Sequence, residues 1–374
     1  MRVGKLSARD IKNLELSDVP FRFVTLVHGP NGVGKSNLLL LLHTLLSRKE
    51  VPPELKDQVR LPIEGLSRIP DFLRRTCQTG TATLTLECYT RQFQQFARRL
   101  LNAGRGKGIP VPHQVSIDFE IRDYSDAIRV IVTEIRLGTR PIFGPRVKSP
   151  ASAETQSALE DWIAKEVAGS TVYIPANRVY KRDPVPLNLK VVEPAVYHLE
   201  NAVLRMLTSP DPRTDTLEAV KKTMKDFFKI QDIRSELRPS EVRDSLGQST
   251  QELLVGVRLQ EGSGDWFDLE RMGTGIQQLL VIVCMIHLSG ARIALIEEFD
   301  SSLSPGKRNQ LTELLKQLVG ETKPLRQIIA SSHTTFEPRQ DRVLSLGAER
   351  TLNSTVKFRP WTKSDWARFS AGGE

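Results

Sequence analysis

A glycine-rich loop near the N-terminus has the residue types needed to hold a phosphate. The run G-x-x-x-x-G-K-S follows an apolar stretch at residues 21–27 and precedes a leucine-rich run at residues 38–42. Glycines let backbone N–H groups turn inward around a phosphate, and the start of a following helix adds partial positive charge. Lys35 can reach two phosphates of a nucleotide, and the Ser36 hydroxyl can ligate Mg²⁺. A glycine-rich turn before an ordinary helix is the alternative, but it does not account for strand, loop, Lys-Ser and helix in this order. The loop consists of Gly29, Pro30, Asn31, Gly32, Val33, Gly34, Lys35, Ser36 and Asn37.

Two acids follow a short apolar run much later in the chain. Residues 293–296 are Ile-Ala-Leu-Ile, and Glu297 and Glu298 come directly after them. A buried strand in a parallel sheet delivers such side chains to its carboxyl end, where ligands bind in α/β proteins. One carboxylate can hold Mg²⁺, and the next can orient or deprotonate an attacking water. A solvated strand end is the alternative, and the phosphate loop upstream makes it the weaker interpretation.

A histidine ends the next apolar run. Residues 328–332 are Ile-Ile-Ala-Ser-Ser, and His333 follows. A single histidine at a strand end is often structural. In series with the phosphate loop and the two acids, His333 is a candidate sensor of a γ-phosphate.

The surrounding pattern alternates strands and helices. Helices are expected at residues 276–288 and 305–318, and strands at residues 293–296 and 327–330, which predicts a mostly parallel sheet. Residues 11–16 and 21–27 are expected as two strands. Period-two alternation predicts further strands at residues 81–89, 115–121 and 128–135, forming an antiparallel region.

Composition narrows the class of protein. The 374 residues include 53 Lys and Arg against 44 Asp and Glu, a formal charge of +9. This excess is consistent with polyanion binding and equally with an ordinary basic protein. Three cysteines without CxxC spacing argue against zinc sites and disulfide frameworks. No apolar run reaches the length of a membrane span, so we expect a soluble, cytoplasmic protein.

These motifs together resemble the ATPase heads of the ABC superfamily, and within it the SMC-like, OLD-like branch labelled AAA15/AAA21. The likeness spans about residues 1–50 and 250–350, with a looser match at residues 173–178. It implies an α/β P-loop NTPase of ABC type with a mostly parallel core sheet, an antiparallel β subdomain and a helical insertion. We expect an ATPase core at 1–50 and 250–350, an inserted β-rich region at 51–194, a charged helical insertion at 195–249 and a C-terminal tail at 351–374.

The resemblance assigns roles to the motif residues. ATP and Mg²⁺ are the implied cofactors, with Lys35 and Ser36 at the phosphates and metal, and Glu297 as the Walker B metal residue. Glu298 is the implied catalytic carboxylate and His333 the switch histidine. In this family two heads enclose two ATP molecules, so an active dimer or higher oligomer is expected. A signature loop before a helix would cover the γ-phosphate bound to the second subunit; it corresponds here to Gly273, Thr274 and Gly275.

The chain departs from the family at several positions. Glu297 stands where Asp is usual, and Gly273 stands where the signature has Ser, although Thr274 can supply a hydroxyl. Gln78, Gln92 and Gln94 are poor matches to the Q-loop glutamine. We therefore expect slow turnover. No long coiled-coil pattern is present, and about 40 residues follow His333, too few for the Toprim nuclease domain of OLD proteins. A nuclease is accordingly expected on a separate chain.

Two functions remain open from the sequence. The first is an ATPase that dimerises around ATP and acts with DNA or a nuclease or effector partner, in genome maintenance or anti-phage defence. The second is a nucleotide-gated scaffold with little turnover that holds or releases an effector. A transporter subunit and a small-molecule kinase fit the motif spacing poorly. Several basic residues could contact DNA, in which case binding would weaken strongly as the salt concentration rises, or they could form solvated faces of the protein. They are Arg98, Arg99, Arg105, Lys107, Lys181, Arg182, Lys221, Lys222, Lys225 and Lys229.

Overall fold

The computed structural model divides the chain into two compact units. The first comprises Met1–Tyr173, Ala291–Phe299 and Leu314–Glu374, and the second comprises Ile174–Gly290 and Asp300–Glu313. The structure describes residues 1–67, 72–73, 77–102, 112–124, 127–147, 153–176, 214–243, 249–301, 303–320, 323, 325–333, 343–351, 355–362 and 364–365.

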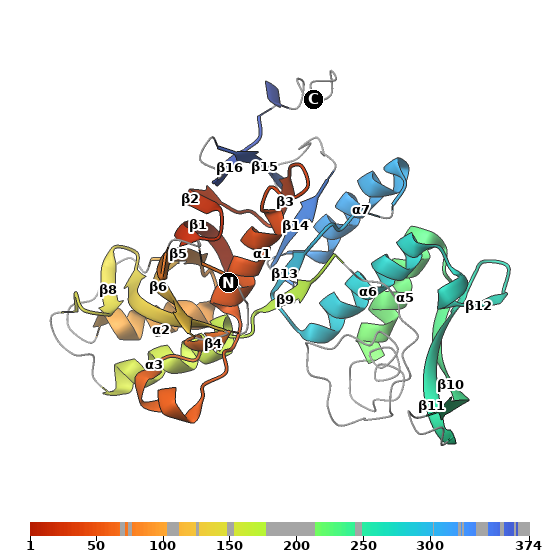
Figure 1. The fold of residues 1–374 in the computed structure, drawn as a ribbon, viewed down its shortest axis with the longest axis horizontal. Coiled ribbons are helices and arrows are strands. Elements are labelled where there is room, and N and C mark those ends of the chain that lie inside the picture. Colours follow the sequence, from red (N-terminus) through yellow and green to blue (C-terminus); the bar gives the residue numbers. More distant parts are fainter. Residues whose placement is uncertain are drawn as a thin grey trace. The chain divides into compact units, whose positions relative to one another are not determined.

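A single sheet runs through the first unit, and its parallel part carries the motifs (Figure 1). The strands β13 (Ile293–Ile296), β14 (Gln327–Ser332), β3 (Val24–His28) and β15 (Val343–Arg350) lie side by side in that order and run in the same direction. Every residue of β13, β14 and β3 is buried. Strands buried along their whole length are typical of parallel sheets covered on both faces. The strand β9 (Thr171–Ile174) pairs with β13 at the edge.

The antiparallel part of the same sheet is built from strands that alternate buried and exposed residues, as expected when one face packs on a core. Its strands, in spatial order, are β4 (Gly65–Ser67), β7 (Ala127–Leu137), β6 (Gln114–Tyr124), β5 (Thr79–Glu87), β1 (Arg2–Ile11) and β2 (Leu14–Pro20), and β8 (Arg140–Phe143) pairs with β7. The strand β16 (Val356–Pro360) joins the two parts, because it pairs with β15 on one side and with β2 on the other.

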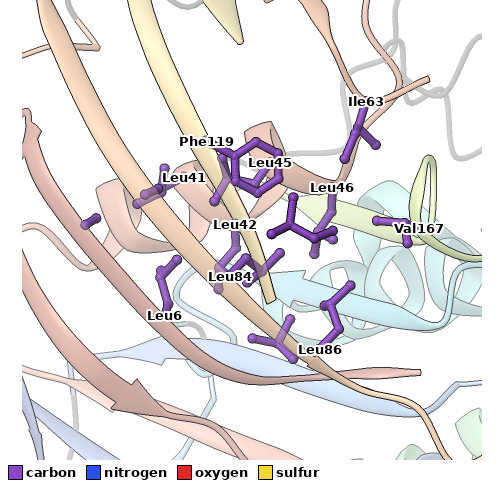
Figure 2. Packing of buried hydrophobic residues seen from close by; sticks show 14 of the residues in the cluster. Leu6, Leu41, Leu42, Leu45, Leu46, Ile63, Leu84, Leu86, Phe119 and Val167 are labelled. Atoms are coloured by element: carbon purple, nitrogen blue, oxygen red, sulfur yellow. The ribbon is translucent and has the colours of Figure 1, made fainter. Parts of the chain in front are cut away.

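The helix α1 (Lys35–Leu46) follows the glycine-rich loop and supplies much of the core. Its leucines pack with Leu6 of β1, Leu84 of β5 and Phe119 of β6 (Figure 2). Leu41 and Leu42 are fully buried. Burial of each such side chain contributes roughly 1.5–3 kcal/mol. The loop before α1 is thus attached to a rigid helix.

Shorter helical elements complete the first unit. They are the 3₁₀ turn η1 (Pro53–Gln58), α2 (Arg91–Asn102), α3 (Ala153–Trp162) and a π-helical turn, η2 (Ile163–Val167). Phe93 and Phe96 of α2 lie against Trp162 of α3, with ring centroids 5.6 and 5.3 Å from it.

The second unit contains a helix pair and a three-stranded antiparallel sheet ordered β10-β11-β12. Val220 and Met224 of α5 and Leu280 and Val283 of α6 are fully buried. The elements are α5 (Thr214–Phe228), β10 (Asp232–Arg243), β11 (Ser249–Gln260), β12 (Trp266–Asp268), the 3₁₀ turn η3 (Leu269–Arg271) and α6 (Thr274–Ser289). The helix α7 (Pro305–Leu318) has residues in both units.

The predicted fold class is confirmed: the protein is a mixed α/β protein with a parallel core and an antiparallel region. One local expectation, a continuous strand at residues 11–16, is wrong. β1 ends at Ile11 and β2 starts at Leu14, with Lys12 at a left-handed φ of 46° between them. Ile11 and Leu14 pair across this hairpin. The turn is short enough to preserve the apolar alternation, so the pattern looked uninterrupted.

The expected helical insertion at 195–249 is only partly correct. Its residues 214–228 form α5, whereas residues 232–243 form the strand β10, which pairs in unbroken register with β11. Pro239 disfavours a helix at residues 232–243, and pairing with β11 makes this segment a strand. Residues 195–213 and 244–248 lie outside the described residues.

The domain boundaries expected from the sequence remain a prediction. Within the described part of the chain, no helix is both long and apolar enough to cross a membrane.

Candidate functional site

The glycine-rich loop connects β3 to α1 through backbone conformations that favour glycine. Gly29, Gly32 and Gly34 have φ values of 150°, 69° and 109°. A Cβ added at Gly34 would lie 3.1 Å from the side-chain oxygen of Asn13. Gly34 also caps α1 without a side chain, so the first N–H groups of the helix face a potential anion. This backbone fits a phosphate cradle.

Lys35 is the first residue of α1, and its ammonium group lies within the loop. It donates to the carbonyl oxygens of Gly29 and Pro30, at 2.6 and 2.8 Å. Its Nζ also lies 3.4 Å from Nδ1 of His333. The lysine charge is therefore held at the loop.

The remaining loop residues are arranged around this lysine. Pro30, Asn31, Gly32 and Ser36 are exposed, and Val33 is buried. Asn37 donates from Nδ2 to Oδ1 of Asn13, at 2.9 Å, which ties the start of α1 to the β1–β2 turn. This contact was not anticipated, because nothing in the local pattern links residues 13 and 37.

The two acids lie at the carboxyl end of β13, where the sequence placed them. Glu297 is buried at 8% exposure, and Glu298 is more open. The backbone turns sharply at Glu298, which has a φ of 42°. Its N–H donates to Oγ of Ser331, at 3.0 Å, and the N–H of Phe299 donates to the Ser331 carbonyl oxygen, at 3.1 Å. A left-handed non-glycine residue stores about 1–3 kcal/mol of strain, and such residues gather at functional sites.

His333 lies between Lys35 and Glu298. Its Nε2 is 2.7 Å from Oε1 of Glu298, and its Nδ1 faces the lysine ammonium. An ammonium group can only donate, so Nδ1 is the acceptor and Nε2–H donates to the carboxylate. The structure thus brings Lys35, His333 and Glu298 into one hydrogen-bonded chain within the first unit.

Replacement of His333 by alanine should slow ATP hydrolysis more than it weakens ATP binding. The ring contacts the carboxylate that would handle the attacking water, while the phosphate loop does not need it for its own shape. We expect kcat to fall about 10- to 100-fold, within the range of acid–base groups, and the Kd for ATP to change less than about threefold. A phosphate-release assay measures kcat, and equilibrium binding measures the Kd for ATP. His113→Ala, at an exposed histidine, serves as the control. Unchanged turnover would make His333 a structural residue.

Tyr173 is a site residue to which the sequence motifs assigned no role. It lies in β9, beside β13, and its hydroxyl forms a hydrogen bond with the carboxylate of Glu297. Burial raises the pKa of Tyr173 above its ordinary value, and the charge and hydrogen bond of Glu297 raise it further. A tyrosine two positions before the proline that follows a strand was the available signal, but the strand order was needed to find its partner.

The signature-loop residues belong to the second unit. Gly273 is the N-cap of α6 and Thr274 its first residue, and both are exposed. Gln277 donates to the carbonyl oxygens of Leu269 and Met272, each at 3.0 Å, and so fixes the loop before the helix. Gly275, the second residue of α6, is half-buried.

The basic residues differ in availability. Arg98 on α2 and Lys222, Lys225 and Lys229 are exposed. Lys221 is engaged with Asp232, at 2.8 Å, and Glu218, at 3.5 Å. Arg105, Lys107, Lys181 and Arg182, and the side chain of Arg99, lie outside the described residues.

The residues present suit a nucleotide with Mg²⁺. The loop offers glycine backbone and a lysine, while Ser36 and Glu297 offer oxygen ligands of the kind Mg²⁺ takes. Mg²⁺ at such sites is bound by one or two protein groups together with phosphate oxygens. Among the described residues, no cluster of three or more His, Cys, Asp and Glu side chains able to hold a metal occurs.

Comparison with known proteins agrees with this geometry. Residues 174–337 match the family model described as "AAA domain, putative AbiEii toxin, Type IV TA system". A crystal structure of an Smc head bound to the C-terminal winged-helix domain of ScpA has a TM-score of 0.52 and 15% identity, covering 98% of this chain and 100% of that one. An Smc head with an extended coiled coil, bound to the C-terminal domain of ScpA derived from Pyrococcus furiosus, has a TM-score of 0.50 and 13% identity, covering 99% and 98%. No curated protein sequence matches the chain.

The structural likeness extends over nearly the whole chain and establishes the fold, while the family match covers the acids, the histidine and the signature-like loop. The OLD-like part of the resemblance remains a prediction. The chain has the fold of the Smc head domains, and its residues 174–337 match the AAA family model.

Proposed function

We propose that the protein binds and slowly hydrolyses ATP, dimerises around the nucleotide, and transmits its state to a separate partner. The observation that carries this proposal is the hydrogen-bonded chain from Lys35 through His333 to Glu298, next to a phosphate-loop backbone. It combines a phosphate-binding charge with a carboxylate suited to orient water.

Each residue has a task in the proposed reaction. The loop N–H groups and Lys35 hold the phosphates, and Ser36 and Glu297 hold the metal. When bound, Mg²⁺ neutralises charge on the β- and γ-phosphate oxygens. Glu298 orients and deprotonates the attacking water, and His333 keeps that carboxylate in place and contacts the γ-phosphate.

Dimerisation follows from the signature loop. Gly273 and Thr274 are exposed at the start of α6, and together with Gly275 they offer N–H groups and a hydroxyl, which suits the γ-phosphate held by a second copy. Two such copies would enclose two ATP molecules and so couple occupancy to assembly.

A separate partner protein is supported by the comparisons. Solved Smc heads were crystallised with a domain of ScpA, and the matching family is described as a toxin of a toxin–antitoxin system. An effector or nuclease chain that reads the ATP state fits both descriptions. DNA is a further candidate, through Arg98, Lys222, Lys225 and Lys229, in genome maintenance or anti-phage defence.

Calorimetric titration with MgATP and a phosphate-release assay on the purified chain test the central claim. We expect saturable ATP binding and hydrolysis below about 1 s⁻¹, the low end of common enzyme turnover. Absence of ATP binding at millimolar nucleotide would overturn the proposal. Native mass spectrometry of the tagged protein from its own cells, with ATP and Mg²⁺, separates a homodimer from a complex with a second gene product.

A further inference from the structure

We propose that Tyr173 is a positioning residue whose hydroxyl holds the carboxylate of Glu297 in the orientation that binds Mg²⁺. This inference rests on the proposed ATPase function. It concerns a residue that lies in the loosely matching stretch 173–178 and to which the sequence assigned no role.

The strand arrangement supports the pairing. The N–H groups of Arg292 and Ile293 both donate to the carbonyl oxygen of Ser170, at 2.9 and 3.0 Å, so β9 and β13 start at the same edge. Tyr173 and Glu297 therefore reach the opposite edge together, where the tyrosine hydroxyl bonds the buried carboxylate.

Glu297 has a particular need for such a partner. Glutamate carries one more rotatable bond than the aspartate usual at this position, so more conformations must be excluded before its carboxylate can bind a metal. A hydrogen bond from outside the ligand set orients a ligand and is commonly worth 10- to 100-fold in metal affinity.

The tyrosine ring is itself fixed by the helix that begins at the phosphate loop. His43 of α1 stacks on it, with ring centroids 5.4 Å apart and planes at 28°. His43 Nδ1 lies 3.2 Å from Oγ1 of Thr171, in the same strand as the tyrosine. Burial, helped by the charge of Lys49, lowers the pKa of His43 to about 4, so the stacked ring is neutral at physiological pH. The stack therefore connects the helix carrying Lys35 and Ser36 to the metal carboxylate.

The variant Tyr173→Phe tests this role because it keeps the ring and removes only the hydroxyl. Binding of a fluorescent ATP analogue is measured without Mg²⁺, in EDTA, and then as a function of Mg²⁺ concentration. We expect metal-free binding to be unchanged and the Mg²⁺ concentration at half-maximal enhancement to rise about tenfold. An equal Mg²⁺ midpoint in wild type and variant would overturn the inference while leaving the ATPase proposal intact. If the wild type binds no nucleotide under any condition, both fail.

Two controls separate positioning from general damage. Tyr89→Phe also removes a tyrosine hydroxyl near a carboxylate, Oε2 of Glu87 at 3.3 Å, but on an exposed residue away from the site, and should leave the Mg²⁺ midpoint unchanged. Tyr173→Phe in a Glu297→Asp background should have a smaller effect than in wild type, because the shorter side chain draws the carboxylate back from the hydroxyl. An equally large effect in both backgrounds would mean that the hydroxyl acts elsewhere, and would contradict the inference.

Discussion

Lys35→Ala should abolish ATP binding, weakening it at least about 100-fold. The ammonium group supplies charge-assisted hydrogen bonds to phosphate, each worth roughly 1.5–3 kcal/mol, and a 100-fold loss corresponds to about 2.7 kcal/mol. In the structure the ammonium group contacts the carbonyl oxygens of Gly29 and Pro30 in the loop and Nδ1 of His333. The chain should still fold, because the core is formed by the leucines of α1 and not by the loop. Calorimetry measures the affinity for ATP, and circular dichroism measures whether the variant is folded.

Two variants sharpen this experiment. Lys35→Met keeps the length of the side chain without its charge and should bind as poorly as the alanine variant. Lys56→Ala removes an exposed lysine on η1 and should bind ATP normally. Retained affinity in both Lys35 variants would contradict the phosphate-loop assignment.

Glu298→Gln should trap the ATP state. The amide keeps an oxygen that can accept from Nε2–H of His333, so the local geometry is preserved, but it cannot deprotonate water. We expect kcat to fall about 10²- to 10⁴-fold, the range of general base catalysis, with ATP binding retained. Sedimentation velocity with ATP should show the dimer accumulating. Turnover equal to wild type would remove Glu298 from the mechanism, and Glu54→Gln serves as an exposed control.

The same variant distinguishes the two functions left open by the sequence. A protein that works through repeated hydrolysis should lose its cellular activity when trapped. A scaffold gated by ATP occupancy should keep its assembly with the effector or become constitutively active. The substitutions at Glu297 and Gly273 favour the scaffold, whereas the aligned chain of Lys35, His333 and Glu298 favours hydrolysis.

Motif spacing predicted the main part of the site because parallel strands deliver their carboxyl ends to one edge. Glu298 and His333 follow adjacent strands β13 and β14, and Lys35 follows β3, the next neighbour. Their proximity could therefore be inferred from order alone. The parallel core could be inferred from the alternation of strands and helices in the last third of the chain.

The remaining features depend on pairings that no local pattern encodes. Tyr173 meets Glu297 only because β9 lies beside β13, although the two residues are distant in sequence. Residues 232–243 form a strand because β11 pairs with them along their length. Asn13 contacts Asn37 because a tight hairpin at Lys12 replaces the expected continuous strand. Each miss is a case of tertiary contacts overriding local propensity.

The strand order has a consequence for synthesis of the protein. β3, which ends at the phosphate loop, has β14 and β15 as its neighbours, and Lys35 is separated from His333 by 298 positions. At translation rates of about 5–20 residues per second, the N-terminal loop waits roughly 15–60 s on the ribosome before its partners are made. Until then both edges of β3 lack their native neighbours, a condition that favours aggregation. Nascent chains should therefore require chaperone protection, and the ability to bind ATP should arise only late in translation.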